Sequence, residues 1–140
     1  MRHESTITID APAALVWQTI HTVEKWPEWT PTMRQVRRLD DGDLRVGSTA
    51  EVRQPNQPKR VWTVTELVPD RSFTWVASNL GVRLTAEHTV TEQDGTVGAL
   101  LTFELTGRLA AVSALLAGRM IRRLVDLEAA SLKKWCEAHA

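Results

Sequence analysis

Apolar and polar residues alternate along much of the chain between residues 34 and 107, which is the period of half-buried β-strands. The pattern predicts strands over 34–39, 48–54, 60–68, 72–78, 82–92 and 97–107. The clearest strand has one largely apolar face, formed by Val82, Leu84, Ala86, His88 and Val90. Asp94-Gly95 precedes the last strand and favours a tight hairpin turn, because these residues tolerate positive φ angles. We therefore expect a series of antiparallel strands.

Within the strand over 60–68, strict alternation assigns the side chains to two faces. Trp62, Val64 and Val68 fall on one face, and Val61 and Leu67 fall on the other. A one-residue shift in pairing exchanges the faces, so the sequence leaves open which face is buried.

Helical periodicity replaces alternation near both ends of the chain. A first strand around residues 6–10 is followed by a short apolar stripe, Leu15, Val16 and Ile20. From about residue 109 to 139, apolar residues recur at helical spacing and predict a helix of about 45 Å, at about 1.5 Å per residue. Such a helix can cross a curved sheet. We expect an α+β fold with the long helix on the concave face of an antiparallel sheet.

Residues 26–31, Trp-Pro-Glu-Trp-Thr-Pro, carry two large apolar rings without the periodicity of a packed element. The two prolines fix φ at two points and stiffen the segment. We interpret it as a loop that covers a cavity and that acts, with the turn at Gly81, as a moving gate.

Several short motifs follow one another in a specific order: the first strand leading into Ala11–Trp17, then Trp26–Trp29, Val46-Gly47-Ser48, Glu66–Arg71, Asp94-Gly95-Thr96 and the closing amphipathic helix. Together they resemble the SRPBCC superfamily, also called START-like or birch-pollen-allergen-like, and within it the polyketide cyclase/dehydrase branch. The resemblance covers almost the whole chain, so we expect a single domain over 1–140.

The resemblance implies the helix-grip fold. In this fold a strongly curved antiparallel sheet of six to seven strands wraps around a long C-terminal helix. Two short helices follow the first strand, and sheet and helix enclose a hydrophobic cavity. The superfamily includes lipid carriers, cyclases, hydrolase-like enzymes and chaperone cofactors, so the resemblance does not fix an activity.

Composition excludes some classes of function. The 140 residues carry 17 basic and 17 acidic side chains, and this balance argues against a nucleic-acid-binding protein. With no net charge to oppose self-association, both a monomer and a homodimer remain open. No apolar run approaches the ~20 residues of a membrane span, so we expect no integral membrane association. The single cysteine, Cys136, and the absence of a signal-peptide pattern favour a cytoplasmic protein.

Six tryptophans, two phenylalanines and no tyrosine are an unusual aromatic balance, and the flat indole ring suits cores and ligand pockets alike. Trp62 and Trp75 would line a cavity if both face inward, whereas the alternative places one on the convex face. Methionines adapt to irregular ligands but are also ordinary core residues. The candidate ligand-binding residues are Trp26, Trp29, Met33, Trp62, Trp75, His88, Phe103, Leu116 and Met120.

His88 is the one histidine on a confidently predicted apolar strand face, and it has two interpretations. In one, its imidazole orients a ligand or acts as a general acid or base. In the other, it is a polar residue whose hydrogen bonds are satisfied within the sheet. Glu104 lies on the neighbouring strand opposite a residue near 85, adjacent to His88 only diagonally.

The sequence contains no metal-ligand spacing, no phosphate-binding loop and no GxSxG motif, so we expect no metal and no cofactor. The leading hypothesis is the binding of a small hydrophobic or aromatic molecule, such as a lipid or polyketide, in an internal cavity. The alternatives are a polyketide cyclase or dehydratase that uses His88, and an interaction protein such as a toxin–antitoxin-like partner.

A basic cluster on the long helix also has two interpretations: Arg119, Arg122, Arg123, Lys133 and Lys134. It is either a solvated helix face or a docking site for an anionic headgroup or membrane surface.

Overall fold

A computed structural model describes all 140 residues and contains seven strands, three α-helices and one short 3₁₀ helix. Their bounds, in chain order, are β1 Arg2–Thr8, α1 Ala13–His21, η1 Val23–Lys25, α2 Trp26–Trp29, β2 Gln35–Arg38, β3 Thr49–Arg53, β4 Arg60–Val68, β5 Ser72–Asn79, β6 Val82–Gln93, β7 Thr96–Thr106 and α3 Ala110–His139. The strands predicted between 34 and 107 are confirmed to within one residue at each end.

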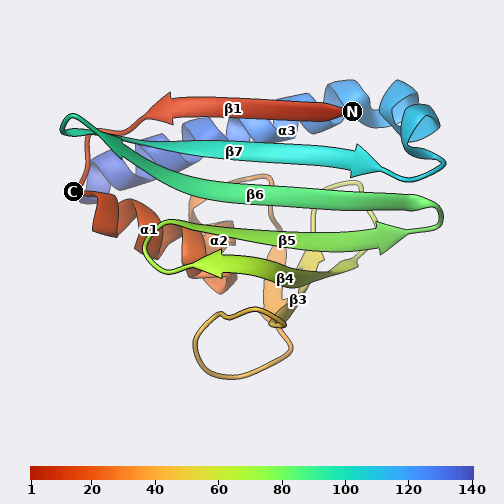
Figure 1. Cartoon of the computed structure of the whole chain (residues 1–140), viewed down its shortest axis with the longest axis horizontal. Helices are drawn as coiled ribbons and strands as arrows, with labels where there is room; N and C mark the ends of the chain where they lie inside the picture. The colour runs from red at the N-terminus through yellow and green to blue at the C-terminus, as the bar shows by residue number, and fades with distance from the viewer.

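All seven strands form one antiparallel sheet in the order β1-β7-β6-β5-β4-β3-β2. The helix α3 runs behind the sheet, from the end that carries the β5–β6 turn to the end that carries α1 (Figure 1). It packs mainly on β1 and β7, while α1 and α2 cover other parts of the same side. This arrangement is the helix-grip fold that the resemblance implies. No helix combines the length and the apolar character needed to cross a membrane.

A β-bulge in β4 changes which residues face the core. Val64 pairs with Trp75, but the next pair is Glu66 with Thr74, so Thr65 is an extra residue in the strand. The bulge inverts the alternation beyond it. Leu67 therefore packs against the core, whereas Val68 is 50% exposed. The assignment of Val68 to the face of Trp62 and Val64 was wrong for this reason.

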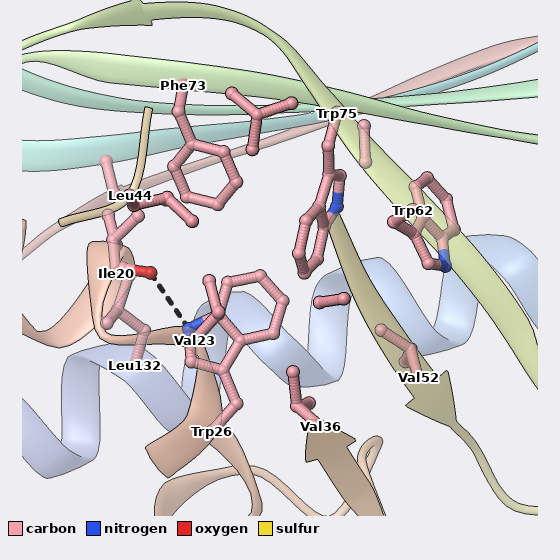
Figure 2. Packing of buried hydrophobic residues seen from close by; sticks show 14 of the residues in the cluster. Ile20, Val23, Trp26, Val36, Leu44, Val52, Trp62, Phe73, Trp75 and Leu132 are labelled. Atoms are coloured by element: carbon pink, nitrogen blue, oxygen red, sulfur yellow. Dashed lines mark hydrogen bonds between the residues drawn. The ribbon is translucent and has the colours of Figure 1, made fainter. Parts of the chain in front are cut away.

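The segment predicted as a tryptophan-bearing loop is instead packed helical structure. One 3₁₀ turn, η1, leads directly into the single-turn helix α2, with Pro27 in the first turn, where its missing N–H leaves no hydrogen bond unmade. Trp26 is only 1% exposed, and its Nε1–H donates to the carbonyl oxygen of Ile20 over 2.9 Å (Figure 2). The segment is thus fixed against α1 and the sheet by burial and by a buried hydrogen bond.

Candidate ligand cavity

A cavity of about 310 Å³ lies between the concave face of the sheet and α3. It exists because α3 packs mainly on β1 and β7, whereas the concave side of β5 is met by Trp26 of the short helix α2. Sixteen of the 23 lining residues are hydrophobic. A mostly apolar lining with a few polar groups and a volume near ~300 Å³ are typical of a site for a small organic molecule.

Eight of the nine candidate residues line this cavity: Trp26, Met33, Trp62, Trp75, His88, Phe103, Leu116 and Met120. They come from α2 and the segment after it, from the strands β4 to β7, and from α3, so the fold collects them from distant parts of the sequence. Trp29 is the exception. It is buried and packs edge-on against Trp26, with ring centroids 6.0 Å apart, but it does not line the cavity.

Trp62 and Trp75 both face inward, which resolves the alternative that the sequence left open. They lie diagonally across the β4–β5 pair with ring centroids 5.6 Å apart, and Figure 2 shows both rings extending from the sheet toward α2 and α3. Trp75 also meets the ring of Trp26 edge-on at 5.2 Å. These three indoles form a continuous aromatic wall.

His88 lies at the deep end of this wall, held by aromatic rings. Its imidazole stacks on Phe73 at 4.5 Å and lies 5.1 Å from the ring of Trp26. The side chain is only 6% exposed, and its Nδ1 atom has no hydrogen-bond partner. The backbone of its pairing neighbour Phe73 acts on the imidazole and opposes the effect of burial on its pKa, so the interpretation of His88 as a polar residue held within the sheet stays a prediction.

The carboxylate of Glu128, on α3, faces His88 across the cavity, with Oε1 3.8 Å from Nε2. Glu128 is 13% exposed at its side chain, and its Oε1 has no hydrogen-bond partner. Burial lowers the pKa of His88 to about 4 and raises the pKa of Glu128 to about 7. The distance alone would permit an ion pair, but burial keeps the imidazole neutral at pH 7. At neutral pH the two groups therefore provide a neutral imidazole beside a carboxyl group that gains and loses its proton near pH 7.

Glu128 is a site residue that the sequence reasoning missed. It lies in the middle of the apolar stripe of α3, four residues after Leu124, three after Val125 and four before Leu132. A helix places residues at these spacings on one face. A carboxylate inside a core-facing stripe was the signal that could have identified it.

The mouth of the cavity is more polar than its interior. Arg60, at the start of β4, donates from Nη1 to Oε1 of Gln57 over 2.8 Å, and its Nε is buried without a partner. Burial lowers the pKa of the Arg60 guanidinium, which has no acidic partner within ion-pair distance. Gln54, Asn79 and Ser113 are further polar residues of the lining. An oxygen-bearing ligand would meet hydrogen-bond donors at the mouth and the His88–Glu128 pair inside.

The fold and the cavity are those of a helix-grip protein. Residues 2–137 match the model of the family described as polyketide cyclase / dehydrase and lipid transport, and the chain belongs to this family. No curated protein matches the chain.

Solved structures share the fold at low sequence identity. The hypothetical protein jhp0584 from Helicobacter pylori is 12% identical with a TM-score of 0.80, over 96% of this chain and 86% of that chain. TTHA0849 from Thermus thermophilus is 11% identical with a TM-score of 0.77, over 100% and 99%. The Zhui aromatase/cyclase from Streptomyces sp. R1128 is 20% identical with a TM-score of 0.70, over 99% and 92%.

Proposed function

We propose that the protein binds a small, flat, largely apolar molecule that carries at least one hydroxyl or carbonyl oxygen. The observation that carries this proposal is the pair His88 and Glu128, in which Oε1 of Glu128 is buried without a hydrogen-bond partner inside a mostly apolar cavity. A buried polar group without a hydrogen bond costs about 1–3 kcal/mol. A ligand hydroxyl placed beside Nε2 of His88 that donates to Oε1 of Glu128 would remove the cost at the carboxyl group.

The rest of the cavity supports the same class of ligand. The wall formed by Trp26, Trp62 and Trp75 offers ring faces and edges to a planar molecule. Apolar burial contributes about 25 cal/mol per Å² before the entropy lost on binding is subtracted. The wall would supply most of the affinity, and His88 and Glu128 would select for oxygen at one position.

The direct test is to titrate the purified protein with planar aromatic ketones and phenols. Tryptophan fluorescence and native mass spectrometry detect the binding. Ala117→Phe places a ring into the cavity lining from α3, and should abolish binding. Ala111→Phe is the matched control, because Ala111 is exposed on the same helix and does not line the cavity. Equal binding by both variants would place the ligand elsewhere and would end the proposal.

A second candidate function is acid–base catalysis, as in an aromatase/cyclase, and the geometry of His88 and Glu128 favours it specifically. A protonated Glu128 could donate to a carbonyl oxygen, and the neutral imidazole could accept a proton from an adjacent carbon or hydroxyl. The raised pKa of Glu128, about 7, suits a group that must hold and release a proton near neutrality. The solved Zhui aromatase/cyclase shares the fold.

Turnover separates the two candidates. A carrier returns the bound molecule unchanged, whereas a cyclase converts a poly-β-ketone probe to a product of different mass. Glu128→Gln keeps the shape and a hydrogen bond but removes the titrating proton. A cyclase would lose most of its rate with this change, while a carrier would keep its affinity within about tenfold. The interaction-protein hypothesis stays a prediction.

A further inference from the structure

Six apolar side chains form an exposed rim on the β5–β6 turn and the first half of α3. We call them the leucine rim: Leu80, Leu109, Val112, Leu115, Leu116 and Met120, whose exposed fractions are 91%, 44%, 55%, 86%, 82% and 39%. Large exposed apolar patches on soluble proteins mark surfaces that meet another phase or partner. Leu80 and Leu115 do not line the cavity, so ligand binding alone does not account for them.

The rim lies beside an opening of the cavity, because Leu116 and Met120 line the cavity and are also exposed. The N–H of Leu109 donates to the carbonyl oxygen of Gly81 over 3.1 Å, which holds the start of α3 beside the β5–β6 turn. Both elements lie at the same end of the sheet in Figure 1. Leu116 and Met120 line the cavity together with Val82, so the rim is continuous with the cavity lining. Whatever covers the rim therefore faces the entrance of the cavity.

The charge around the rim is one-sided. Residues 107–125 include four arginines and no acidic residue, in a chain whose formal net charge is zero. The four are Arg108, Arg119, Arg122 and Arg123, and all are exposed and outside any ion pair. A helix with protruding leucines and flanking arginines has the composition of a helix that lies in the interface of an anionic bilayer.

We propose that the leucine rim docks this protein on the surface of an anionic lipid bilayer. The leucines enter the boundary between headgroups and acyl chains, and the four arginines contact the acidic headgroups. In this orientation the mouth of the cavity faces the bilayer, so an apolar ligand passes between membrane and cavity without crossing water. The protein lies on the membrane and does not span it.

The charges argue against a second copy of the chain as the occupant. In a symmetric dimer the same patch meets itself, so the interface would bring together eight arginines and no acidic residue from residues 107–125 of the two copies. An acidic bilayer instead offers opposite charge to every arginine and an apolar phase to every leucine. The docking inference does not depend on whether the cavity carries or converts its ligand.

The test is co-sedimentation with vesicles of phosphatidylcholine alone and with about 30% phosphatidylglycerol added. The wild-type protein should bind the acidic vesicles at least tenfold more tightly, and high salt should weaken this binding. The variant L80S/L115S should lose at least tenfold in vesicle affinity. Arg119→Gln and Arg123→Gln should each weaken binding about fivefold. Val46→Ser is the matched control, because Val46 is 61% exposed in the β2–β3 connection and lies outside the rim.

Three results would overturn the proposal: no binding of the wild-type protein to acidic vesicles, equal loss in the Val46→Ser control, or equal binding to neutral and acidic vesicles. A concentration-dependent dimer that L80S/L115S dissociates, without vesicle binding, would assign the rim to a second copy. Capture of an acidic protein through the rim, without vesicle binding, would assign it to a protein partner. L80S/L115S should retain its melting temperature and its affinity for a soluble cavity ligand, so loss of docking and loss of cavity binding are distinguishable.

Discussion

Glu128 and His88 face each other across the cavity with 3.8 Å between Oε1 and Nε2, and burial shifts their pKa values in opposite directions. The carboxyl group holds its proton to about pH 7, and the imidazole stays unprotonated down to about pH 4. The pair is thus uncharged over much of the range in which an exposed pair would be an ion pair. Between the two pKa values, this relationship makes this part of the cavity polar without making it charged.

The first prediction concerns the pH dependence of stability. Glu128 and His88 each make the free energy of unfolding depend on pH, but in opposite directions, so the two effects partly cancel in the wild-type protein. The pKa of Glu128 rises from 4.5 to about 7 on folding, so Glu128 makes the free energy of unfolding fall as the pH rises through this interval. The pKa of His88 falls from 6.5 to about 4, so His88 makes the free energy of unfolding rise as the pH rises through that interval. Between about pH 4.5 and 6.5 the two effects oppose each other.

Single variants should separate the two effects. The free energy of unfolding of Glu128→Gln, relative to wild type, should rise by on the order of 3 kcal/mol between pH 4.5 and 7. That of His88→Gln, relative to wild type, should fall by on the order of 3 kcal/mol between pH 4 and 6.5. Urea unfolding at a series of pH values measures both differences. Glu104→Gln, on the convex face of β7, controls for loss of a carboxylate. Parallel curves for wild type and Glu128→Gln would show that Glu128 titrates normally in the folded protein.

The second prediction concerns the trade between stability and binding at this pair. Replacing both polar groups, in H88F/E128M, removes two buried atoms without partners and keeps similar volume. We expect this variant to be more stable than wild type by about 1–3 kcal/mol at pH 7, because unsatisfied buried polar groups are unfavourable. It should also lose affinity for oxygen-bearing ligands.

Thermal unfolding and ligand titration check the two halves of this prediction. A variant that is less stable than wild type would mean that the pair contributes to folding through contacts other than those seen here. Unchanged affinity for a phenolic ligand would remove the pair from the binding site.

Much of the architecture follows from local patterns in the sequence. Alternation predicted the strands of the sheet because one face is buried throughout, and helical spacing predicted α3 for the same reason. The bulge at Thr65 was invisible, since no residue at that position requires it and it depends on how β4 meets β5. Its consequence, the exchange of Leu67 and Val68, was therefore missed.

The candidate site was predictable only in part, for a related reason. Eight large side chains were found to line the cavity because apolar residues on inward faces converge there. Trp29 was expected to do the same, but α2 turns its ring against Trp26 and away from the lining. Glu128 was overlooked because it approaches His88 only when α3 crosses the sheet, a contact between residues 40 positions apart in the sequence.

The third prediction compares the two tryptophans of α2. Trp26→Phe removes the hydrogen bond to Ile20, leaves that carbonyl oxygen without its donor, and opens space among Phe73, Trp75 and His88. We expect a loss of about 2–4 kcal/mol. Trp29→Phe should cost less, because its buried Nε1 has no partner to lose. Chemical denaturation of both variants measures the difference, and an equal loss would show that ring volume outweighs the hydrogen bond.

The fourth prediction uses the one glycine inside α3. Gly118 is buried within the helix, and a Cβ added there would meet the sulfur of Met1 at 3.5 Å, an ordinary van der Waals contact. Alanine has the higher helix propensity, so Gly118→Ala should stabilise the protein by about 0.5–1 kcal/mol. Gly98→Ala is the contrasting variant, since its Cβ would collide with the carbonyl oxygen of Ile7 on β1. It should weaken the β1–β7 pairing and lower the melting temperature. If Gly118→Ala were instead destabilising, the packing of Met1 on α3 would be tighter than the helix propensity can offset.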